Sequence, residues 1–175
     1  MPNSGPGLGA SLSRRVVIGI DPGLASLGYG IIAEEGGKLF HVLHGCISTS
    51  PGQESGERLD HIYSQIRSII HLYKPDFGGV EDLYFFRNVS SALPVAEARG
   101  AIKLAFRHSG VPLEEYSPNA IKKAVTGTAR ADKEQVQEMV RMILGLSEAP
   151  KPDHAADALA AAICQIGRAS CRERV

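Results

Sequence analysis

The sequence predicts an α/β fold in which helices cover both faces of a mixed, five-stranded sheet. Three strand-like apolar segments come first, close enough together to form hairpins. Alternating helical and strand-like patterns follow, and the chain ends in several helices. With 175 residues, the chain has room for one domain with a sizeable core and little room for a second.

The first three strands follow from short runs of β-branched and alternating apolar residues. Residues 16–20 form an apolar run typical of a buried central strand, which leads Asp21 into a Pro-Gly turn. A second apolar stretch covers residues 28–33, and apolar and polar side chains alternate over residues 38–48. Residues 50–55 are rich in turn formers and end this group.

The later elements alternate between helical and strand-like patterns. Apolar residues at helical spacing predict a helix from Arg58 to Tyr73, which Lys-Pro-Asp ends. A fourth strand at 77–81 finishes on a carboxylate, as the first strand does. The remaining predictions are a helix from Val89 or Ser90 to Ser109, a strand at 111–116, and helices at 119–125, from 132 or 133 to 144, and from 154 to about 166.

Composition and terminal sequence bound the domain and its surroundings. We expect residues 1–14 to be a disordered extension, 15–166 to be the folded domain, and 167–175 to be a loose tail that need not be native. Three scattered cysteines offer no disulfide framework and fit a reducing cytosol: Cys46, Cys164 and Cys171. No apolar run approaches the roughly 18 residues of a membrane helix, so no membrane partner is expected.

Basic residues concentrate in one part of a chain whose formal net charge is zero. Between residues 99 and 133, seven lysines and arginines accompany three acidic residues. Such a run is usually a solvated face, and the alternative is a surface for an anionic partner.

Carboxylates follow apolar segments at three places. Asp21 ends the first strand, Glu81 ends the fourth, and Asp157 lies in the first turns of the last helix. His154 and Asp153 precede Asp157 by three and four residues, so either can share its helix face. If the three carboxylates converge, their repulsion destabilises the fold unless a cation neutralises them.

Oxygen ligands of this kind suit Mg²⁺ or Mn²⁺. Two such ions about 4 Å apart would stabilise the attacking and leaving oxygens of phosphodiester hydrolysis. Each residue also has a plainer interpretation: Asp21 as a turn residue, Glu81 as a surface residue, Asp153 as a helix cap and His154 as an ordinary histidine. Asp157 is harder to explain in that way, because the alanines and leucine around it are patterned for burial.

Several segments together carry a recognisable pattern. Gly-Ile-Asp-Pro-Gly at 19–23, with Gly28 after it, is followed by Val-Glu-Asp at 80–82. The pattern continues through 88–100, 121–127 and 131–136, and ends with His-Ala-Ala-Asp-Ala-Leu-Ala at 154–160. In this order and spacing, the segments resemble the RuvC family of bacterial Holliday-junction resolvases across roughly residues 15–166, the whole expected domain.

The resemblance implies an RNase H-like fold and a structure-selective DNA endonuclease that acts in recombination and repair. It implies a homodimer that places paired, symmetric nicks in a four-way DNA junction. The implied cofactor is Mg²⁺, with Mn²⁺ able to replace it and two ions in each active site. A bacterial cytoplasmic location and a branch-migration motor, the RuvAB complex, are implied as well.

The resemblance also assigns site residues. The catalytic, metal-binding positions of the family fall on Asp21, Glu81, His154 and Asp157. Many members have Asp where this chain has His154 and some have His, so Asp153 is a second candidate for the fourth ligand. The family's stacking aromatic and its basic DNA contacts fall on Tyr84, Arg87, Lys122, Lys123 and Lys133. Either Lys122 or Lys123 is expected to face the scissile phosphate.

Three other functions compete with this one. Actin-like and sugar-kinase ATPases also place an Asp-x-Gly turn after a first strand, but they need two related domains, and this chain shows no repeat. A related nuclease acting on RNA is disfavoured by the aromatic and basic segment 84–87. A junction-binding protein that has lost cleavage is disfavoured because Asp21, Glu81 and Asp157 are all present.

Overall fold

The computed structural model describes residues 14–82 and 89–172, with side chains described for 14–82 and 92–168. Five strands lie within these ranges: β1 (Arg15–Asp21), β2 (Ser26–Glu35), β3 (Lys38–Ser48), β4 (Phe77–Glu81) and β5 (Leu113–Tyr116). The helices of the same ranges are α1 (Ser55–Tyr73), α2 (Val89–Ser109), α3 (Pro118–Thr126), α4 (Lys133–Leu144) and α5 (Asp153–Arg172).

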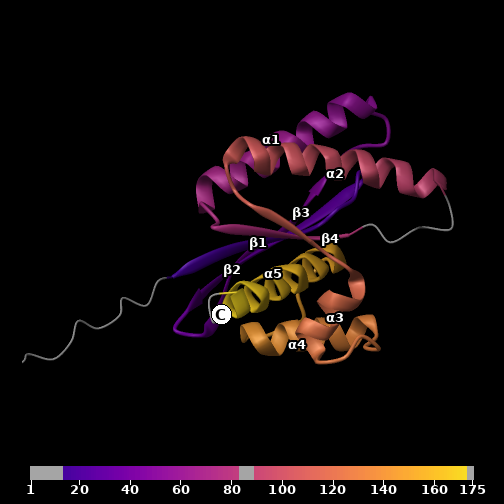
Figure 1. Cartoon of the computed structure of the whole chain (residues 1–175). Coiled ribbons are helices and arrows are strands. Elements are labelled where there is room, and N and C mark those ends of the chain that lie inside the picture. Colours follow the sequence, from indigo (N-terminus) through magenta and orange to yellow (C-terminus); the bar gives the residue numbers. More distant parts are fainter. Residues whose placement is uncertain (1–13, 83–88, 173–175) are drawn as a thin grey trace, which may run out of the picture.

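The strands form one sheet in the order β3-β2-β1-β4-β5 (Figure 1). The first three strands form an antiparallel meander, whereas β4 pairs parallel with β1 and β5 pairs parallel with β4. The prediction of a mixed, five-stranded α/β sheet is therefore confirmed. Because β1, β4 and β5 run in the same direction, their carboxyl ends meet at one edge of the sheet.

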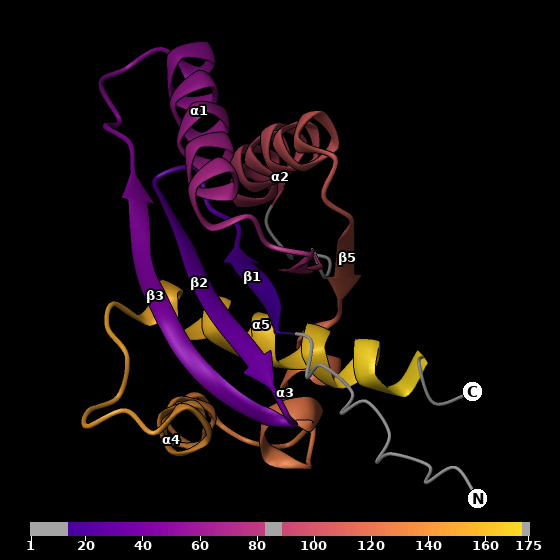
Figure 2. The same cartoon turned by 90° about the vertical axis from the view of Figure 1, so that its left-hand side faces the viewer.

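Helices cover both faces of the sheet, as the sequence predicts. Figures 1 and 2 show α1 and α2 on one face and α5, with α3 and α4 beyond it, on the other. Residues such as Ile18, Ile62 and Phe106 form the core under α1 and α2. Residues such as Val17, Val136 and Leu159 form the core on the α5 side, so successive β1 residues face opposite layers.

Several elements differ in extent from the sequence prediction. The strand β2 begins at Ser26, before the predicted start at 28, because Ser26 pairs with Ser48 of β3. The helix α1 begins at Ser55, ahead of Arg58. The strand β5 begins at Leu113 rather than 111, because the Val111 amide donates a hydrogen bond to the Phe106 carbonyl of α2 and Pro112 has no amide hydrogen.

The last helix is also longer than predicted, because α5 continues to Arg172 instead of ending near residue 166. A single glycine at 167 costs only about 1 kcal/mol within a helix, which ongoing backbone hydrogen bonds can offset. Residues 167–172, expected in a loose tail, are helical. Among the described helices, none combines the length and hydropathy needed to cross a membrane.

Capping explains where the two helices near the sheet edge begin. Ser117 accepts the amide of Ala120 at the start of α3. The Asp132 side chain accepts a hydrogen bond from the backbone amide of Gln135, and the Gln135 side chain accepts one from the backbone amide of Asp132. This capping box fixes the start of α4. Lys122 and Lys133 thereby occupy defined positions next to the carboxyl ends of the strands.

Candidate active site

The sheet brings Asp21 and Glu81 to the same edge. The parallel register of β1 and β4 places Ile20 opposite Val80, so the two carboxylates are the next residues on neighbouring strands. Alternation along β4 directs Val80 into the core under α1 and α2 and Glu81 toward the α5 face. The two strand-end carboxylates predicted from the sequence therefore lie side by side.

The helix α5 crosses the sheet at very short range, and glycines make this possible. A Cβ atom on Gly28 would lie 1.9 Å from the carbonyl oxygen of His154, and one on Gly19 would lie 1.9 Å from that of Ala158. Any larger residue at these positions would push the helix away from the sheet. Both glycines therefore determine how closely the first turns of α5 approach Asp21.

Three of the predicted side chains converge where α5 begins. Among the described residues, Asp21, His154 and Asp157 form a group whose possible ligand atoms all lie within 4.8 Å of one another. His154 Nδ1 lies 2.7 Å from Asp21 Oδ2, within hydrogen-bonding distance. The carboxylate of Asp21 is 14% exposed and the His154 ring is 50% exposed, so the group opens to solvent on one side.

The pKa values of the two aspartates in the group are raised first by burial and then by neighbouring carboxylates. Burial raises the pKa of Asp21 and the charge of Asp157 raises it further, while the hydrogen bond with His154 acts in the opposite direction. Burial also raises the pKa of Asp157, against the lowering effect of Lys133. Both carboxylates are thus harder to ionise than isolated aspartates, unless a cation joins them.

Glu81 has the largest pKa shift of the site. Its pKa is raised to about 7, first by burial and then by the charges of Asp21 and Asp157. Lys122 and Lys133 lower it in part. A carboxyl group that is half protonated near neutral pH at the edge of a cavity is typical of a functional site.

The structure separates Asp153 from His154, the two candidates for the fourth ligand. Asp153 Oδ2 lies 3.1 Å from Lys133 Nζ, and Asp153 Oδ1 accepts a hydrogen bond from Gln137 at 3.1 Å. These hydrogen bonds, that of Lys133 first, lower the pKa of Asp153, whose side chain is 64% exposed. His154, and not Asp153, contacts Asp21 in this structure.

Two of the predicted lysines lie beside the carboxylates. Lys133 Nζ is 3.5 Å from Asp157 Oδ2 and also pairs with Asp153. Lys122 lines a cavity of about 250 Å³ together with Glu81, Lys133 and Asp157. This cavity carries both signs of charge and lies directly at the carboxyl end of β4.

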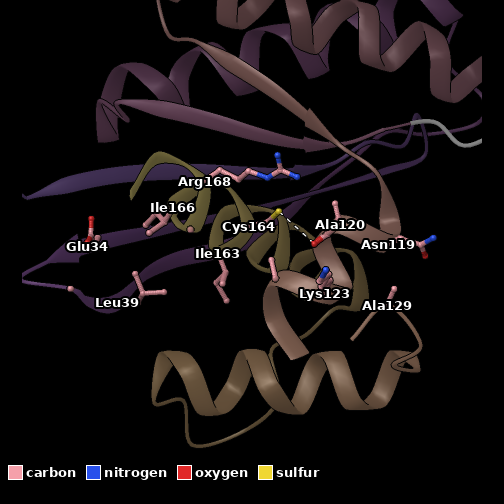
Figure 3. A pocket seen from close by; sticks show the side chains of 13 residues that line it. Glu34, Leu39, Asn119, Ala120, Lys123, Ala129, Ile163, Cys164, Ile166 and Arg168 are labelled. Carbon is pink, nitrogen blue, oxygen red and sulfur yellow. Dashed lines mark hydrogen bonds between the residues drawn. The ribbon is translucent and has the colours of Figure 1, made fainter. Parts of the chain in front are cut away.

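Lys123 lies elsewhere, although it is adjacent to Lys122 in the sequence. It lines a larger groove of about 850 Å³ between α3, the end of α5 and the β2–β3 hairpin. Figure 3 shows Lys123 in this groove near Ala120 and Cys164, whose Sγ lies 3.8 Å from the Ala120 carbonyl oxygen. The predicted DNA contacts Tyr84 and Arg87 lie outside the described residues.

One charged side chain near the site received no role of its own in the sequence analysis, although it lies in the basic run and in the 88–100 segment of the family pattern. Arg99 of α2 is only 6% exposed and donates a hydrogen bond to the backbone carbonyl oxygen of Glu81. Its position in the helical pattern of α2 indicates that it is buried. Ala98, Ile102 and Phe106 mark the buried face of α2, and Arg99 adjoins that face.

Comparisons with known proteins agree with this geometry. The family model described as crossover junction endodeoxyribonuclease RuvC matches residues 17–165. A crossover junction endodeoxyribonuclease RuvC from Treponema denticola is 54% identical over 153 residues, which are 87% of this chain and 86% of the relative.

Solved structures give the same result. The RuvC of Thermus thermophilus in complex with a Holliday junction substrate is 39% identical, with a TM-score of 0.87, and the match covers 90% of this chain and 96% of that one. A yeast mitochondrial Holliday junction resolvase shares only 14% identity, with a TM-score of 0.59 over 91% of this chain and 86% of its own, and supports the RNase H-like fold alone. The chain therefore belongs to the RuvC family of crossover junction endodeoxyribonucleases.

Proposed function

We propose that this chain, a crossover junction endodeoxyribonuclease by family, cuts four-way DNA junctions through divalent metal ions held by Asp21, Glu81, His154 and Asp157. The observation that carries the proposal is the group formed by Asp21, His154 and Asp157, with ligand atoms within 4.8 Å, beside a glutamate of pKa about 7. Carboxyl groups this crowded favour binding of a cation over ionisation without one.

The donor set fits Mg²⁺, with Mn²⁺ as a substitute. Three carboxyl groups supply the hard oxygen ligands that Mg²⁺ prefers, and an imidazole nitrogen is acceptable to Mn²⁺ as well. We propose two ions per site. When bound, such ions would supply a nucleophile by lowering the pKa of a bound water, and would stabilise charge on the attacking and leaving oxygens of phosphodiester hydrolysis.

The chain's own residues prepare the site for an anionic substrate. Lys122 and Lys133 line the cavity beside Glu81, so two ammonium groups lie where a phosphate would approach the carboxylates. The contact between His154 and Asp21 restrains the imidazole ring in one orientation. Lys133 restrains the carboxylate of Asp157 in the same way.

A cleavage assay with labelled four-way junctions tests the proposal. The wild-type protein should nick the junction in Mg²⁺ or Mn²⁺ and leave it intact in EDTA, and it should spare a linear duplex of the same sequence. Asp21→Asn removes the charge but preserves the shape of the side chain, so this variant should bind the junction without cutting it. Undiminished cutting by Asp21→Asn would refute the assignment of the site.

The same assay distinguishes the alternative functions. A nuclease specific for RNA would cut structured RNA in preference to the DNA junction. A protein that only binds junctions would retard the junction in a gel in every metal and cut it in none. Isothermal titration of Mn²⁺ into wild-type protein and Asp21→Asn would count the ions, with two expected for the wild type.

We also propose a homodimer, because paired nicks require two active sites. The helix α2 exposes an apolar stripe at helical spacing, formed by Leu93, Ala96, Gly100 and Leu104. Leu93 is 61% exposed and Leu104 is 54% exposed, so two large apolar side chains of one stripe face solvent. Burying such a stripe against a second copy would remove this apolar surface from water.

Light scattering tests the dimer directly. Leu104→Glu should convert the dimer to a monomer, whereas Met142→Glu, at a residue 59% exposed on α4, should leave it unchanged. If Leu104→Glu stays dimeric, the interface does not use this stripe of α2.

A motor complex of the RuvAB type and a bacterial cytoplasmic location stay predictions. Binding of purified RuvAB to the protein–junction complex would test the first.

A further inference from the structure

We propose that Arg99 is a positioning residue for Glu81, fixing the end of β4 from the face of the sheet opposite the carboxylate group. This inference rests on the proposed nuclease function of that group. It assigns a role in the reaction to a residue that lies in the 88–100 segment of the family pattern but that neither this pattern nor the metal-ligand geometry gave a role. The inference depends on three contacts of one guanidinium group.

The guanidinium of Arg99 connects α2 to the end of β4 and to β5. Nη1 donates to the backbone carbonyl oxygen of Glu81 at 2.5 Å, and Nη2 donates to Asp82 Oδ1 at 3.1 Å. Nη2 also pairs with the carboxylate of Glu115 on β5. A planar fork with several fixed donors suits such a bridge, and only 7% of the side chain is exposed.

Arg99 and the side chain of Glu81 lie on opposite faces of the sheet. The neighbours of Arg99 on α2, Ala98 and Ile102, belong to the core that contains Val80. The Glu81 side chain points the other way and lines the cavity with Lys122 and Asp157. Arg99 therefore acts through the main chain of Glu81, whereas Lys122 and Lys133 are the cations that lower its pKa.

The end of β4 needs such support. The parallel pairing of β1 with β4 ends at Ile20 opposite Val80, one residue before Glu81. On the other side, Glu81 pairs with Tyr116 of β5, and the Asp82 amide bonds to the Tyr116 carbonyl. Arg99 connects this strand end to α2 and to β5 at once, so it restrains the backbone from which the Glu81 carboxylate projects.

Arg99 also controls charge at this edge of the sheet. Without Arg99, the carboxylates of Asp82 and Glu115 would lack this cation next to β4, which itself ends on the carboxylate of Glu81. Lys103 assists, because its ammonium pairs with the other oxygen of Glu115 at 2.5 Å. The hydrogen bond from Lys103, together with the charge of Arg99, lowers the pKa of Glu115 and keeps it ionised as an anchor.

Arg99→Gln tests the proposal, with Arg141→Gln as the matched control. Arg141 also donates to a carboxylate, that of Glu138, and to a backbone carbonyl, that of Leu146, but it does so near the far end of α4. For each variant we would measure the single-turnover rate at saturating enzyme, the junction Kd in Ca²⁺, and the Mg²⁺ concentration that gives half the maximal rate. Thermal unfolding establishes that both variants are folded at the assay temperature.

Arg99→Gln should lower the single-turnover rate by about 10- to 100-fold and raise the half-saturating Mg²⁺ concentration, as loss of a supporting contact to a metal site does. Its junction Kd should stay within about threefold of wild type, because no phosphate contact is assigned to Arg99. Arg141→Gln should match wild type in all three measurements. Equal rates for the two variants would overturn the proposal, as would a loss of junction affinity that accounts for the whole change in rate.

Arg99→Lys keeps the test valid if the glutamine variant unfolds. A single ammonium retains the charge but cannot span the carbonyl and both carboxylates, so the rate should still fall by about tenfold or more. A wild-type rate for Arg99→Lys would overturn the proposal. Failure of the nuclease assignment itself looks different, since the wild-type protein would then not cut the junction at all.

Discussion

The imidazole of His154 and the carboxylate of Asp21 lie 2.7 Å apart, although 133 residues separate them in the chain. The contact joins the end of the first strand to the first turn of the last helix. In this structure Asp21 contacts His154 and not the neighbouring Asp153, whose carboxylate bonds to Lys133 and Gln137. Two adjacent residues with ligand chemistry thus have different surroundings, and their variants should behave differently.

We predict that His154→Ala lowers junction cleavage by at least about tenfold, because a ligand should matter no less than an outer contact to a metal site. Asp153→Ala should change the rate by less than about threefold, since its contacts are those of an exposed ion pair. Single-turnover cleavage in Mg²⁺ measures both. If Asp153→Ala loses activity and His154→Ala keeps it, the fourth ligand is Asp153.

The sequence alone could not make this choice. Positions three and four residues before Asp157 both share a face with it, so the helical pattern leaves His154 and Asp153 equivalent. The rotation of α5 about its axis determines which of the two side chains contacts Asp21. That rotation depends on packing of the helix against Gly19 and Gly28, which are remote in sequence.

Other parts of the fold were predictable because they follow from local patterns. The apolar runs predicted two strands that end on Asp21 and Glu81, and the structure has both strands. Their parallel pairing, which brings the two carboxylates to one edge, appears only in the sheet topology. The role of Arg99 was not predictable in this way. Its contacts join Glu81, Asp82 and Glu115, which come together only once the sheet and α2 are assembled.

The second prediction concerns the two adjacent lysines of α3. Lys122 lines the cavity with Glu81 and Asp157, so Lys122→Ala should lower the cleavage rate by about 100-fold, the cost of removing one group that stabilises charge in the reaction. Lys123 lines the separate groove of Figure 3, so Lys123→Ala should cost at most a few-fold, through weaker attraction of DNA. Cleavage rates and junction Kd values at fixed salt measure the two effects separately. The reverse order of the two rates would assign the scissile phosphate to Lys123.

The third prediction is a pH-dependent stability difference caused by Glu81. Its pKa is about 7 in the folded protein and near 4.5 when unfolded, so below about pH 4.5 the group is protonated in both states and has no effect. Between pH 4.5 and about 7 the unfolded state ionises while the folded state keeps its proton, so the free energy of unfolding falls across this range and levels off above pH 7. Glu81→Gln removes this loss of stability, so in EDTA it should be more stable than wild type at pH 8, by up to about 3 kcal/mol, and nearly equal at pH 4.5.

Urea unfolding at the two pH values measures this difference, and Mg²⁺ should restore stability to the wild type at pH 8 more than to the variant. Glu115→Gln provides a control of opposite sign. The pKa of Glu115 is lowered by its hydrogen bond from Lys103, so this variant should be less stable than wild type at pH 8. Equal stability of Glu81→Gln and wild type at pH 8 would mean that Glu81 ionises without cost.

The last prediction tests the close approach of α5 to the sheet. A methyl group at residue 28 would lie 1.9 Å from the carbonyl oxygen of His154 and 2.3 Å from its carbon, and both atoms belong to helix backbone that cannot rotate away. Gly28→Ala should therefore destabilise the protein by about 1–3 kcal/mol or more and displace His154 from Asp21, with loss of cleavage. Gly56→Ala is the control, because its nearest neighbours are the flexible carboxylate oxygens of Glu54 at 3.4 and 3.5 Å. Thermal unfolding and cleavage are measured on both variants. If Gly28→Ala matches Gly56→Ala in stability and cleavage, the prediction is wrong, because α5 then has room to move without disturbing the site.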